Sequence, residues 1–183
     1  MGQLDQFAKE TFALETATVT RGAVAWQLPP ELGMSEVRLD GVRLPAAARL
    51  EADGDALVSL VAERDGVVVG HVLFSRMDVE ADGTALSAAG LAPVSVAPGS
   101  QGQGIGDALI RAGLGALREQ GVAASFVLGH EGYYPRFGYS PGLAARFASP
   151  FAGPHFMAMM LDSDAPWPLG GRADYAPAFG RMG

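Results

Sequence analysis

The fold of this chain is decided by residues 94–106, which read VSVAPGSQGQGIG. This stretch predicts a strand followed by a glycine-rich loop. Apolar residues recur at helical spacing from Ile105 to Gln120, which predicts an amphipathic helix. Because Gly102, Gly104 and Gly106 carry no Cβ, the loop can hold bare backbone N–H groups at the helix N-terminus. An anion such as a phosphate docks at an arrangement of this kind.

Two well-known glycine motifs do not fit these residues. A phosphate loop of the Walker type needs a lysine directly after its last glycine, but Gly106 is followed by Asp107. A dinucleotide-binding loop fails on spacing, because its third glycine would also fall at Asp107. A tight strand–helix connection without a ligand stays open on this stretch alone.

Composition limits the classes of function. With 183 residues, 49% of them hydrophobic, the chain can bury one substantial core, so we expect a single domain over residues 1–183. The net charge of -7 argues against nucleic acid, because binding phosphates needs a clustered basic face. An acidic surface favours a cationic partner such as an amine, and it equally serves to keep a protein in solution.

The chain has no cysteine, which excludes disulfides, cysteine metal sites and a covalent acyl-cysteine intermediate. Its histidines, His71, His130 and His155, are too dispersed to indicate a metal site. The first residues lack a basic region followed by an apolar core, and no apolar run approaches the ~20 residues of a membrane span. We therefore expect a cytoplasmic protein that holds no metal and does not contact a membrane.

Strands and turns alternate from Leu57 onward. Asp65-Gly66 and Asp82-Gly83 are the expected turns, since glycine tolerates the positive φ of tight hairpins. Pro93 has no N–H to donate, so we expect an edge or a bulge there. The expected elements are strands at 57–63, 67–74, 86–96 and 124–128, a short helix or turn at 132–137, and a final strand at 156–161 before an irregular tail.

Glycines also interrupt the helix that follows the loop. Gly113 and Gly115 each cost it roughly 1 kcal/mol, and we expect close packing on the sheet to compensate, while Gly121 ends the helix. In the first 50 residues the expected elements are a short amphipathic helix around 4–14, a hairpin at 16–26 that Pro29-Pro30 ends, and a helix at 44–52.

A second block gives the glycine loop more weight. Residues 134–139, YPRFGY, follow the loop after a helix and a strand. The loop resembles the acyl-CoA-binding motif of the GNAT superfamily of N-acetyltransferases, which Gln101, Gly104 and Gly106 match. The second block is similar to that superfamily's Tyr-x-x-x-Gly-aromatic segment. Two motifs in this order are far more specific than either alone.

The resemblance covers roughly Ser59 to Leu161 and implies the architecture. A GNAT fold is α/β, with a mixed, mostly antiparallel sheet flanked by helices. The implied divisions are a cofactor-binding core over 57–161, an atypical N-terminal segment over 1–50 and a C-terminal tail over 162–183.

The resemblance also implies acetyl-CoA as co-substrate. The N–H groups of the loop suit its pyrophosphate, and its pantetheine amides can pair with a strand edge. By resemblance, that edge is the backbone at Val94 and Val96. The implied cofactor-binding residues are Val94, Ser95, Val96, Gln101, Gly102, Gln103, Gly104, Ile105, Gly106 and Tyr134.

By its distance from Gly138, Tyr134 matches the superfamily's general-acid tyrosine, which protonates the leaving thiolate. A phenol with an ordinary pKa of about 10 can donate that proton when it lies next to the sulfur. Tyr133 lies beside it, and a shift of one residue would exchange their roles. Either residue could instead be a core tyrosine with a satisfied hydroxyl, which is the commoner role of this residue type.

The general base stays open. The candidates are Glu63, His71, His130 and Glu131, each of which could act through a water. His130 and Glu131 lie at the end of the strand before Tyr134, so they could reach the same cleft, although a structural role is the commoner one for a single histidine. An acceptor amine of low pKa would need no base.

The resemblance implies an N-acetyltransferase that transfers an acetyl or small acyl group to an amine by direct attack in a ternary complex. The composition, rich in arginine, alanine and glycine, suggests a bacterial source. A catalytically inactive CoA-binding or interaction module with the same fold is one alternative, and a structural domain without a ligand is another. The acceptor stays open among a small amine, an antibiotic, a peptide N-terminus and a lysine side chain. Because many members pair, a homodimer is a further expectation.

Overall fold

The computed structural model describes residues 11–13, 18–20, 38–39, 42–43, 54–64, 67–162 and 166–176. The expected turn at Asp65-Gly66, the helix at 44–52 and most of the N-terminal helix and hairpin lie outside these residues.

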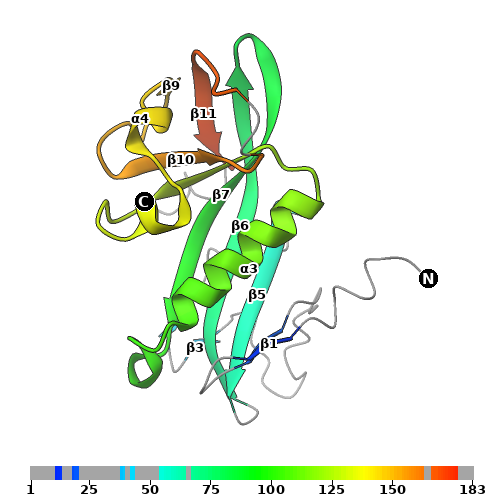
Figure 1. The fold of residues 1–183 in the computed structure, drawn as a ribbon, viewed down its shortest axis with the longest axis vertical. Coiled ribbons are helices and arrows are strands. Elements are labelled where there is room, and N and C mark those ends of the chain that lie inside the picture. The colour runs from blue at the N-terminus through cyan, green and yellow to red at the C-terminus, as the bar shows by residue number, and fades with distance from the viewer. Residues whose placement is uncertain are drawn as a thin grey trace, which may run out of the picture. The chain divides into compact units, whose positions relative to one another are not determined.

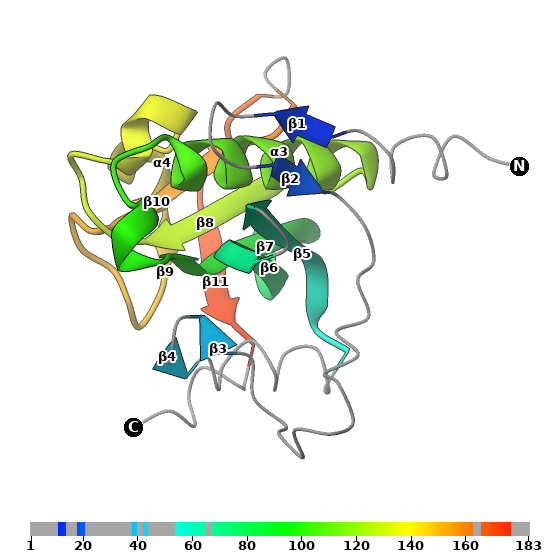
Figure 2. The same ribbon diagram turned by 90° about the horizontal axis from the view of Figure 1, so that it is seen from below.

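A mixed, mostly antiparallel sheet is the main element of the fold, as predicted. Its strands lie in the order β1-β2-β5-β6-β7-β8-β10, and β7 pairs with β8 in parallel while β2 with β5 and β8 with β10 pair antiparallel. The long β6–β7 hairpin is green in Figure 1, and β3 and β4 form a separate two-stranded sheet, drawn in blue in Figure 2. The bounds are β1 Thr11–Ala13, β2 Thr18–Thr20, β3 Arg38–Leu39, β4 Val42–Arg43, β5 Ala56–Arg64, β6 Val67–Ala81, β7 Thr84–Val96, β8 Ala124–Leu128 and β10 Phe156–Met160.

Most predicted boundaries after residue 56 are confirmed. Helix α3 spans Ile105–Glu119 and is followed by Gly121 in the left-handed region at φ +73°. The predicted turn at Asp82-Gly83 is present, with positive φ at both residues. Strand β6 reaches Ala81 instead of residue 74. Burial alternates along the additional residues, as it does in a strand that is covered on one face.

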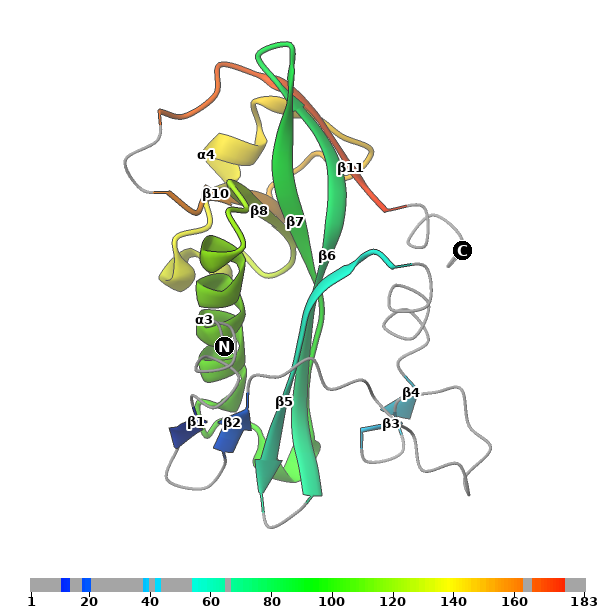
Figure 3. The same ribbon diagram turned by 90° about the vertical axis from the view of Figure 1, so that its right-hand side faces the viewer.

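The tail was predicted wrongly. It contains strand β11, Gly171–Tyr175, which pairs antiparallel with the end of β6 and in parallel with β9, Phe147–Ala148. Figure 3 shows β11 in red beside β6. The strand of residues 156–161 is therefore not the last one. A short helix α4, Pro141–Ala144, was also missed.

The N-terminal segment differs from the prediction where it is described. Phe12, expected in a helix, lies in β1, and β1 pairs antiparallel with β2. Strand β2 in turn pairs with β5, so this segment extends the sheet. No described helix is long and apolar enough to cross a bilayer.

By its internal contacts the chain divides into two compact units. One comprises Met1–Leu73 and Pro93–Gly113, and the other Phe74–Ala92 and Leu114–Gly183. The division crosses β6, β7 and α3, so each of these elements contributes to both units. A single domain over residues 1–183 stays a prediction.

In the first unit, α3 meets the sheet at Gly70 of β6. A Cβ built on Gly70 would lie 2.9 Å from both Ile105 Cγ2 and Leu109 Cδ1, and 3.3 Å from Ala62 Cβ. Ile105 and Leu109 are buried, and Ala62 has no exposed surface. The absent side chain of Gly70 therefore lets the first turns of α3 lie directly on the strand.

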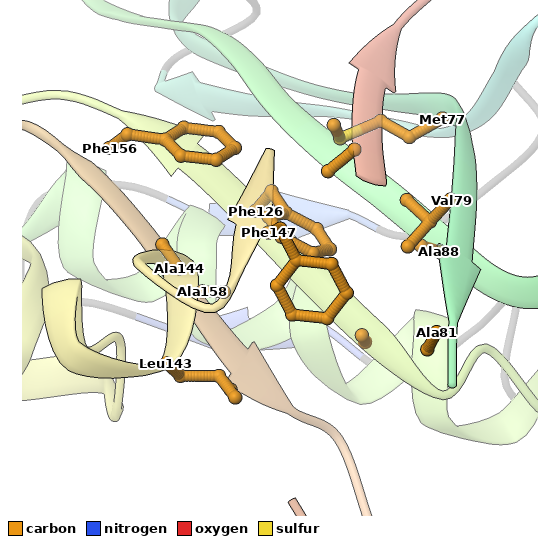
Figure 4. Close-up of a cluster of buried hydrophobic side chains, with 12 residues drawn as sticks. Met77, Val79, Ala81, Ala88, Phe126, Leu143, Ala144, Phe147, Phe156 and Ala158 are labelled. Carbon is orange, nitrogen blue, oxygen red and sulfur yellow. The ribbon is translucent and has the colours of Figure 1, made fainter. Parts of the chain in front are cut away.

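The second unit has its own apolar core. Phe126 of β8 meets Phe147 edge-on at 5.3 Å between ring centroids and stacks on Phe156 at 5.6 Å. Figure 4 shows these rings among small side chains from β6, β7 and α4. The cluster consists of Met77, Val79, Ala81, Ala88, Ala124, Phe126, Leu143, Ala144, Phe147, Phe156, Ala158 and Ala173.

Of the two glycines expected to pack closely on the sheet, Gly115 differs from the prediction. Gly115 is half-buried, and among the described residues no atom lies within 4 Å of a Cβ built there. Close packing does not explain Gly115. Gly113 is buried. The close approach is made by the glycine on the opposing strand, Gly70.

Two Gly→Ala substitutions should therefore have opposite effects. We expect Gly70→Ala to lower the free energy of unfolding by about 1–3 kcal/mol, because the new methyl group overlaps Ile105 and Leu109. Gly115→Ala should raise it by up to about 1 kcal/mol, because alanine favours the helix and meets no neighbour. Urea unfolding followed by circular dichroism measures both, and a destabilised Gly115→Ala variant would contradict the packing described for α3.

Candidate functional site

The glycine loop between β7 and α3 has the backbone shape that its sequence predicts. Gly102 and Gly104 have φ of +73° and +78°, a region that residues with a side chain rarely adopt. Both are exposed. The N–H of Ala108 donates to the carbonyl of Gly104 at 3.0 Å, so the amides of Ile105 and Gly106 precede the first intrahelical bond. These amides lie at the positive end of the helix dipole, which favours an anion.

Side-chain amides fix the loop. Gln101 Nε2 donates to the carbonyl of Val96 at 3.0 Å, and Gln103 Nε2 donates to the carbonyl of Gly99 at 3.3 Å. Arg64, at the end of β5, donates from Nη2 to Gln103 Oε1 at 2.7 Å. Gln101 and Gln103 were predicted to bind the cofactor, and the structure gives each a bond that holds the loop.

Arg64 was not predicted to belong to the loop. It is 39 positions before Gln103 in the chain, and only the pairing of β5 with β6 and of β6 with β7 brings the two together. Its guanidinium adds a positive charge next to the glycines. The sequence signal that could have identified Arg64 is its position as a basic residue directly before the expected Asp65-Gly66 turn.

The predicted strand edge lies on β7. The parallel ladder with β8 covers Ala88 to Leu91, so Val94, Ser95 and Val96 lie beyond its last pair. All three are half-buried. Ala97 N–H donates to the carbonyl of Val69 on β6 at 2.9 Å, so the end of this segment is anchored to the other neighbouring strand.

Tyr134 belongs to the second unit, at the start of the 3-10 turn η3, Tyr134–Phe137. Its ring meets Tyr133 and Tyr139 edge-on, at 5.1 and 6.0 Å between centroids. Phe137 lies at 6.4 Å in a tilted orientation. Burial raises the pKa of the Tyr134 phenol above its ordinary value, so the group keeps its proton at neutral pH.

The neighbouring tyrosines have other partners. The Arg136 guanidinium lies over the Tyr133 ring, 4.5 Å from its centroid, in a cation–π contact. The Tyr139 hydroxyl is buried and forms a hydrogen bond with Ser125 Oγ at 2.7 Å, and its burial raises the pKa of Tyr139. Tyr139 is therefore a core residue, and Tyr133 and Tyr134 are half-buried.

His130 and Glu131 lie in the exposed turn before Tyr134. The carbonyl of His130 accepts the N–H groups of Tyr133 at 2.9 Å and Tyr134 at 3.3 Å. Glu131 Oε1 lies 4.0 Å from Nδ1 of His155, a pairing that the sequence did not predict. Both predicted residues therefore lie in the turn directly before Tyr134, and their catalytic roles stay predictions.

The other two candidate bases are placed differently. His71 has no exposed surface, and its Nε2 lies 3.1 Å from Ser59 Oγ. A base must reach the acceptor amine, so we assign His71 to the core of the first unit. Glu63 belongs to β5, and its side chain lies outside the described part of the chain.

Comparison with known protein families gives one clear match. The model of the acetyltransferase (GNAT) domain matches residues 42–142. Those residues contain the glycine loop and Tyr134.

Curated relatives agree with this match. The chain is 37% identical to the uncharacterized N-acetyltransferase YhbS of Escherichia coli K12 over 138 residues, which is 73% of this chain and 80% of YhbS. It is 44% identical to the uncharacterized N-acetyltransferase YjhQ of the same organism over 84 residues. That alignment spans 46% of each chain, so it covers less than half of YjhQ.

Two solved structures are similar over nearly the whole chain. The crystal structure of E. coli YhbS in complex with CoA is 30% identical, with a TM-score of 0.72 and coverage of 94% of this chain and 96% of YhbS. A GNAT acetyltransferase from Brucella melitensis in complex with acetyl-CoA is also 30% identical. Its TM-score is 0.61, with coverage of 89% of this chain and 97% of that protein.

The buried His71 predicts a pH-dependent stability. Burial lowers the pKa of His71 to about 4, below its ordinary value of 6.5. The unfolded chain therefore binds more protons between these values, and the contribution of neutral His71 is complete above pH 6.5 and lost as pH falls toward 4. Its full size is on the order of 3 kcal/mol.

The measurement is chemical unfolding at several pH values from about 7 to about 5 with the wild type and His71→Asn. The wild type should lose stability more steeply as pH falls, because the asparagine side chain of the variant has no group to protonate. Parallel curves for the two proteins would contradict the assignment of His71 to the core.

Proposed function

This chain belongs to the GNAT family of acetyltransferases, and from this premise we propose that it transfers an acetyl group from acetyl-CoA to an amine. The amine nitrogen attacks the thioester carbonyl directly, the C–S bond breaks, the amine loses a proton and the CoA thiolate gains one. The observation that carries the proposal is the loop Gln101–Gly106, with two exposed left-handed glycines at the start of α3.

The loop suits the cofactor for electrostatic and steric reasons. The pyrophosphate needs several N–H donors, and a loop without Cβ atoms at Gly102 and Gly104 lets it approach the main chain. Arg64 adds a cation beside Gln103. The CoA and acetyl-CoA in the complexes of the two similar proteins support acetyl-CoA as the co-substrate here.

The pantetheine arm is assigned to the end of β7. Val94 and Val96 lie beyond the last pair with β8, and strand-edge groups of this kind accept an amide-containing chain as they would another strand. The bond from Gln101 to the carbonyl of Val96 links this edge to the phosphate loop. In this proposal one segment of the first unit aligns both parts of the cofactor.

Tyr134 is the proposed general acid. Its raised pKa means that the phenol carries its proton at neutral pH, so the acid form is present when the thiolate leaves. Tyr133 is less suitable, because its ring is packed against the Arg136 guanidinium. His130 and Glu131 are exposed in the adjoining turn and are the proposed bases, singly or through a water.

The acceptor is proposed only as an amine, small or peptide-borne. The net charge of -7 favours a cationic acceptor over nucleic acid. The cytoplasmic location, the absence of a membrane contact and a homodimer stay predictions.

Tyr134→Phe tests the acid. We expect the turnover number with acetyl-CoA to fall by about 100-fold or more, because the thiolate then leaves without a positioned proton donor. Thiol release is measured with a panel containing a small diamine, an aminoglycoside, a peptide N-terminus and a lysine peptide. Tyr133→Phe is the matched control and should keep most of the activity. Equal losses in both variants, or a small loss in Tyr134→Phe, would contradict the role of Tyr134.

Gly104→Ala tests the phosphate loop. The alanine side chain is strained at φ +78°, by roughly 1–2 kcal/mol, so the loop of the free variant should leave the left-handed conformation, which CoA binding must then restore. We therefore expect CoA to bind about 5-fold to 30-fold more weakly. Calorimetric titration with CoA measures the change.

Gly99→Ala is the control for the loop. Gly99 has no left-handed φ, and no described atom lies within 4 Å of a Cβ built on it, so the affinity should be unchanged. Unaltered CoA affinity in Gly104→Ala would contradict the proposed site. CoA binding to the wild type without turnover of any amine would favour the inactive CoA-binding module.

A further inference from the structure

We propose that Gly129 is a positioning residue for Tyr134: the space left by its missing side chain is where the Tyr134 ring lies. The inference rests on the proposed function in one respect, namely that the Tyr134 hydroxyl acts as the general acid and must therefore be positioned. Both residues belong to the second unit: Gly129 directly follows β8, and Tyr134 begins η3.

The steric relation is direct. A Cβ built on Gly129 would lie 2.8 Å from Tyr134 Cδ2 and 3.1 Å from Cζ, and it would be closer still to Cε2, the atom between them. Real Cβ atoms essentially never approach a carbon atom within 3.0 Å. One edge of the phenol ring, up to the carbon that carries the hydroxyl, therefore lies against the backbone of Gly129. Any side chain at this position would displace the ring.

The backbone on both sides of the contact is held in place. Gly129 N–H donates to the carbonyl of His155 at 2.9 Å, which continues the pairing of β8 with β10. Tyr134 N–H donates to the carbonyl of His130 at 3.3 Å, and Gly138 ends η3 in the left-handed region with its N–H on the carbonyl of Pro135. If position 129 carried a side chain, its backbone could not move away from the ring without breaking the hydrogen bond to the carbonyl of His155.

The ring also has little freedom on its other sides. Tyr133, Phe137 and Tyr139 surround it with centroids between 5.1 and 6.4 Å. Tyr139 is fixed by its bond to Ser125 and is buried. Gly129 therefore selects one of the few orientations that these neighbours leave, and the hydroxyl position follows from it.

The expected effect is on turnover and not on cofactor affinity. In Gly129→Ala the ring must move, and a misplacement of about 1 Å in a reacting group costs on the order of 100-fold, so we expect a roughly 10-fold to 100-fold lower turnover number. The KM for acetyl-CoA should not change. In the Tyr134→Phe background, Gly129→Ala should cause no further loss, because the hydroxyl through which it acts is already absent.

A second measurement does not depend on activity. The absorbance of phenolate is titrated in four proteins: wild type, Tyr134→Phe, Gly129→Ala and the double variant. The difference within each pair isolates the Tyr134 phenol. Burial holds its pKa above the ordinary value, so displacement of the ring toward solvent should make it titrate at lower pH in Gly129→Ala.

Gly70→Ala is the matched control. A Cβ built on Gly70 would lie 2.9 Å from Ile105 Cγ2 and Leu109 Cδ1, so its neighbours are aliphatic. This variant should destabilise the protein without altering the titration of Tyr134.

The outcomes separate the two hypotheses. An altered Tyr134 titration together with unchanged turnover in Tyr134→Phe would keep the positioning role of Gly129 and overturn the acid. An unaltered titration in Gly129→Ala, or a loss of turnover that is equal in the wild-type and Tyr134→Phe backgrounds, would overturn the positioning role. The same shift of the Tyr134 titration in Gly70→Ala would also overturn it.

Discussion

The structure of the candidate site depends on the close contact between helix α3 and Gly70 of β6. Ile105 and Leu109 occupy the volume that a side chain at position 70 would need, and both are buried. Because Ile105 is also the first residue of α3, the contact that anchors the helix lies directly behind the glycine loop. The position of the loop amides is therefore set by apolar packing, and the loop itself adds little to that packing.

Three glycines serve the site through three different physical effects. Gly70 permits a close approach of two elements, Gly104 adopts a backbone conformation that a side chain would strain, and Gly129 leaves space for a ring. The first effect acts on the framework, the second on the anion-binding amides and the third on the phenol. A glycine that serves none of these, Gly115, only lowers the helix propensity.

In the parts of the fold that could be predicted from the sequence, the local sequence signals agree with the observed structure. Strands rich in β-branched residues, turns with Asp-Gly and a helix between a glycine loop and Gly121 each carry their own signal, so their boundaries were largely right. Strand β11 was missed because Gly171–Tyr175 alternates weakly and follows a segment rich in proline and glycine. Its pairing with β6 supplies the stability that its own residues do not indicate.

The candidate site likewise combines features that a local sequence pattern indicates with contacts that depend on the fold. The loop and Tyr134 were recognisable because the chemistry depends on residues close together in the chain. The contacts of Arg64 with Gln103 and of Gly129 with Tyr134 depend on strand order and on a ring orientation, which no local pattern encodes. His71 could be a base on sequence grounds, and its burial became evident only from the packing around it.

The central claim is that main-chain amides at the start of α3 bind the cofactor's pyrophosphate, and amide-resolved NMR tests it most directly. The protein is titrated with CoA and, separately, with pantetheine, which lacks the phosphates. We predict that the amide signals of Gly102, Gly104 and Ile105 shift strongly with CoA and remain nearly unchanged with pantetheine. Binding of CoA that leaves these three signals in place would contradict the claim.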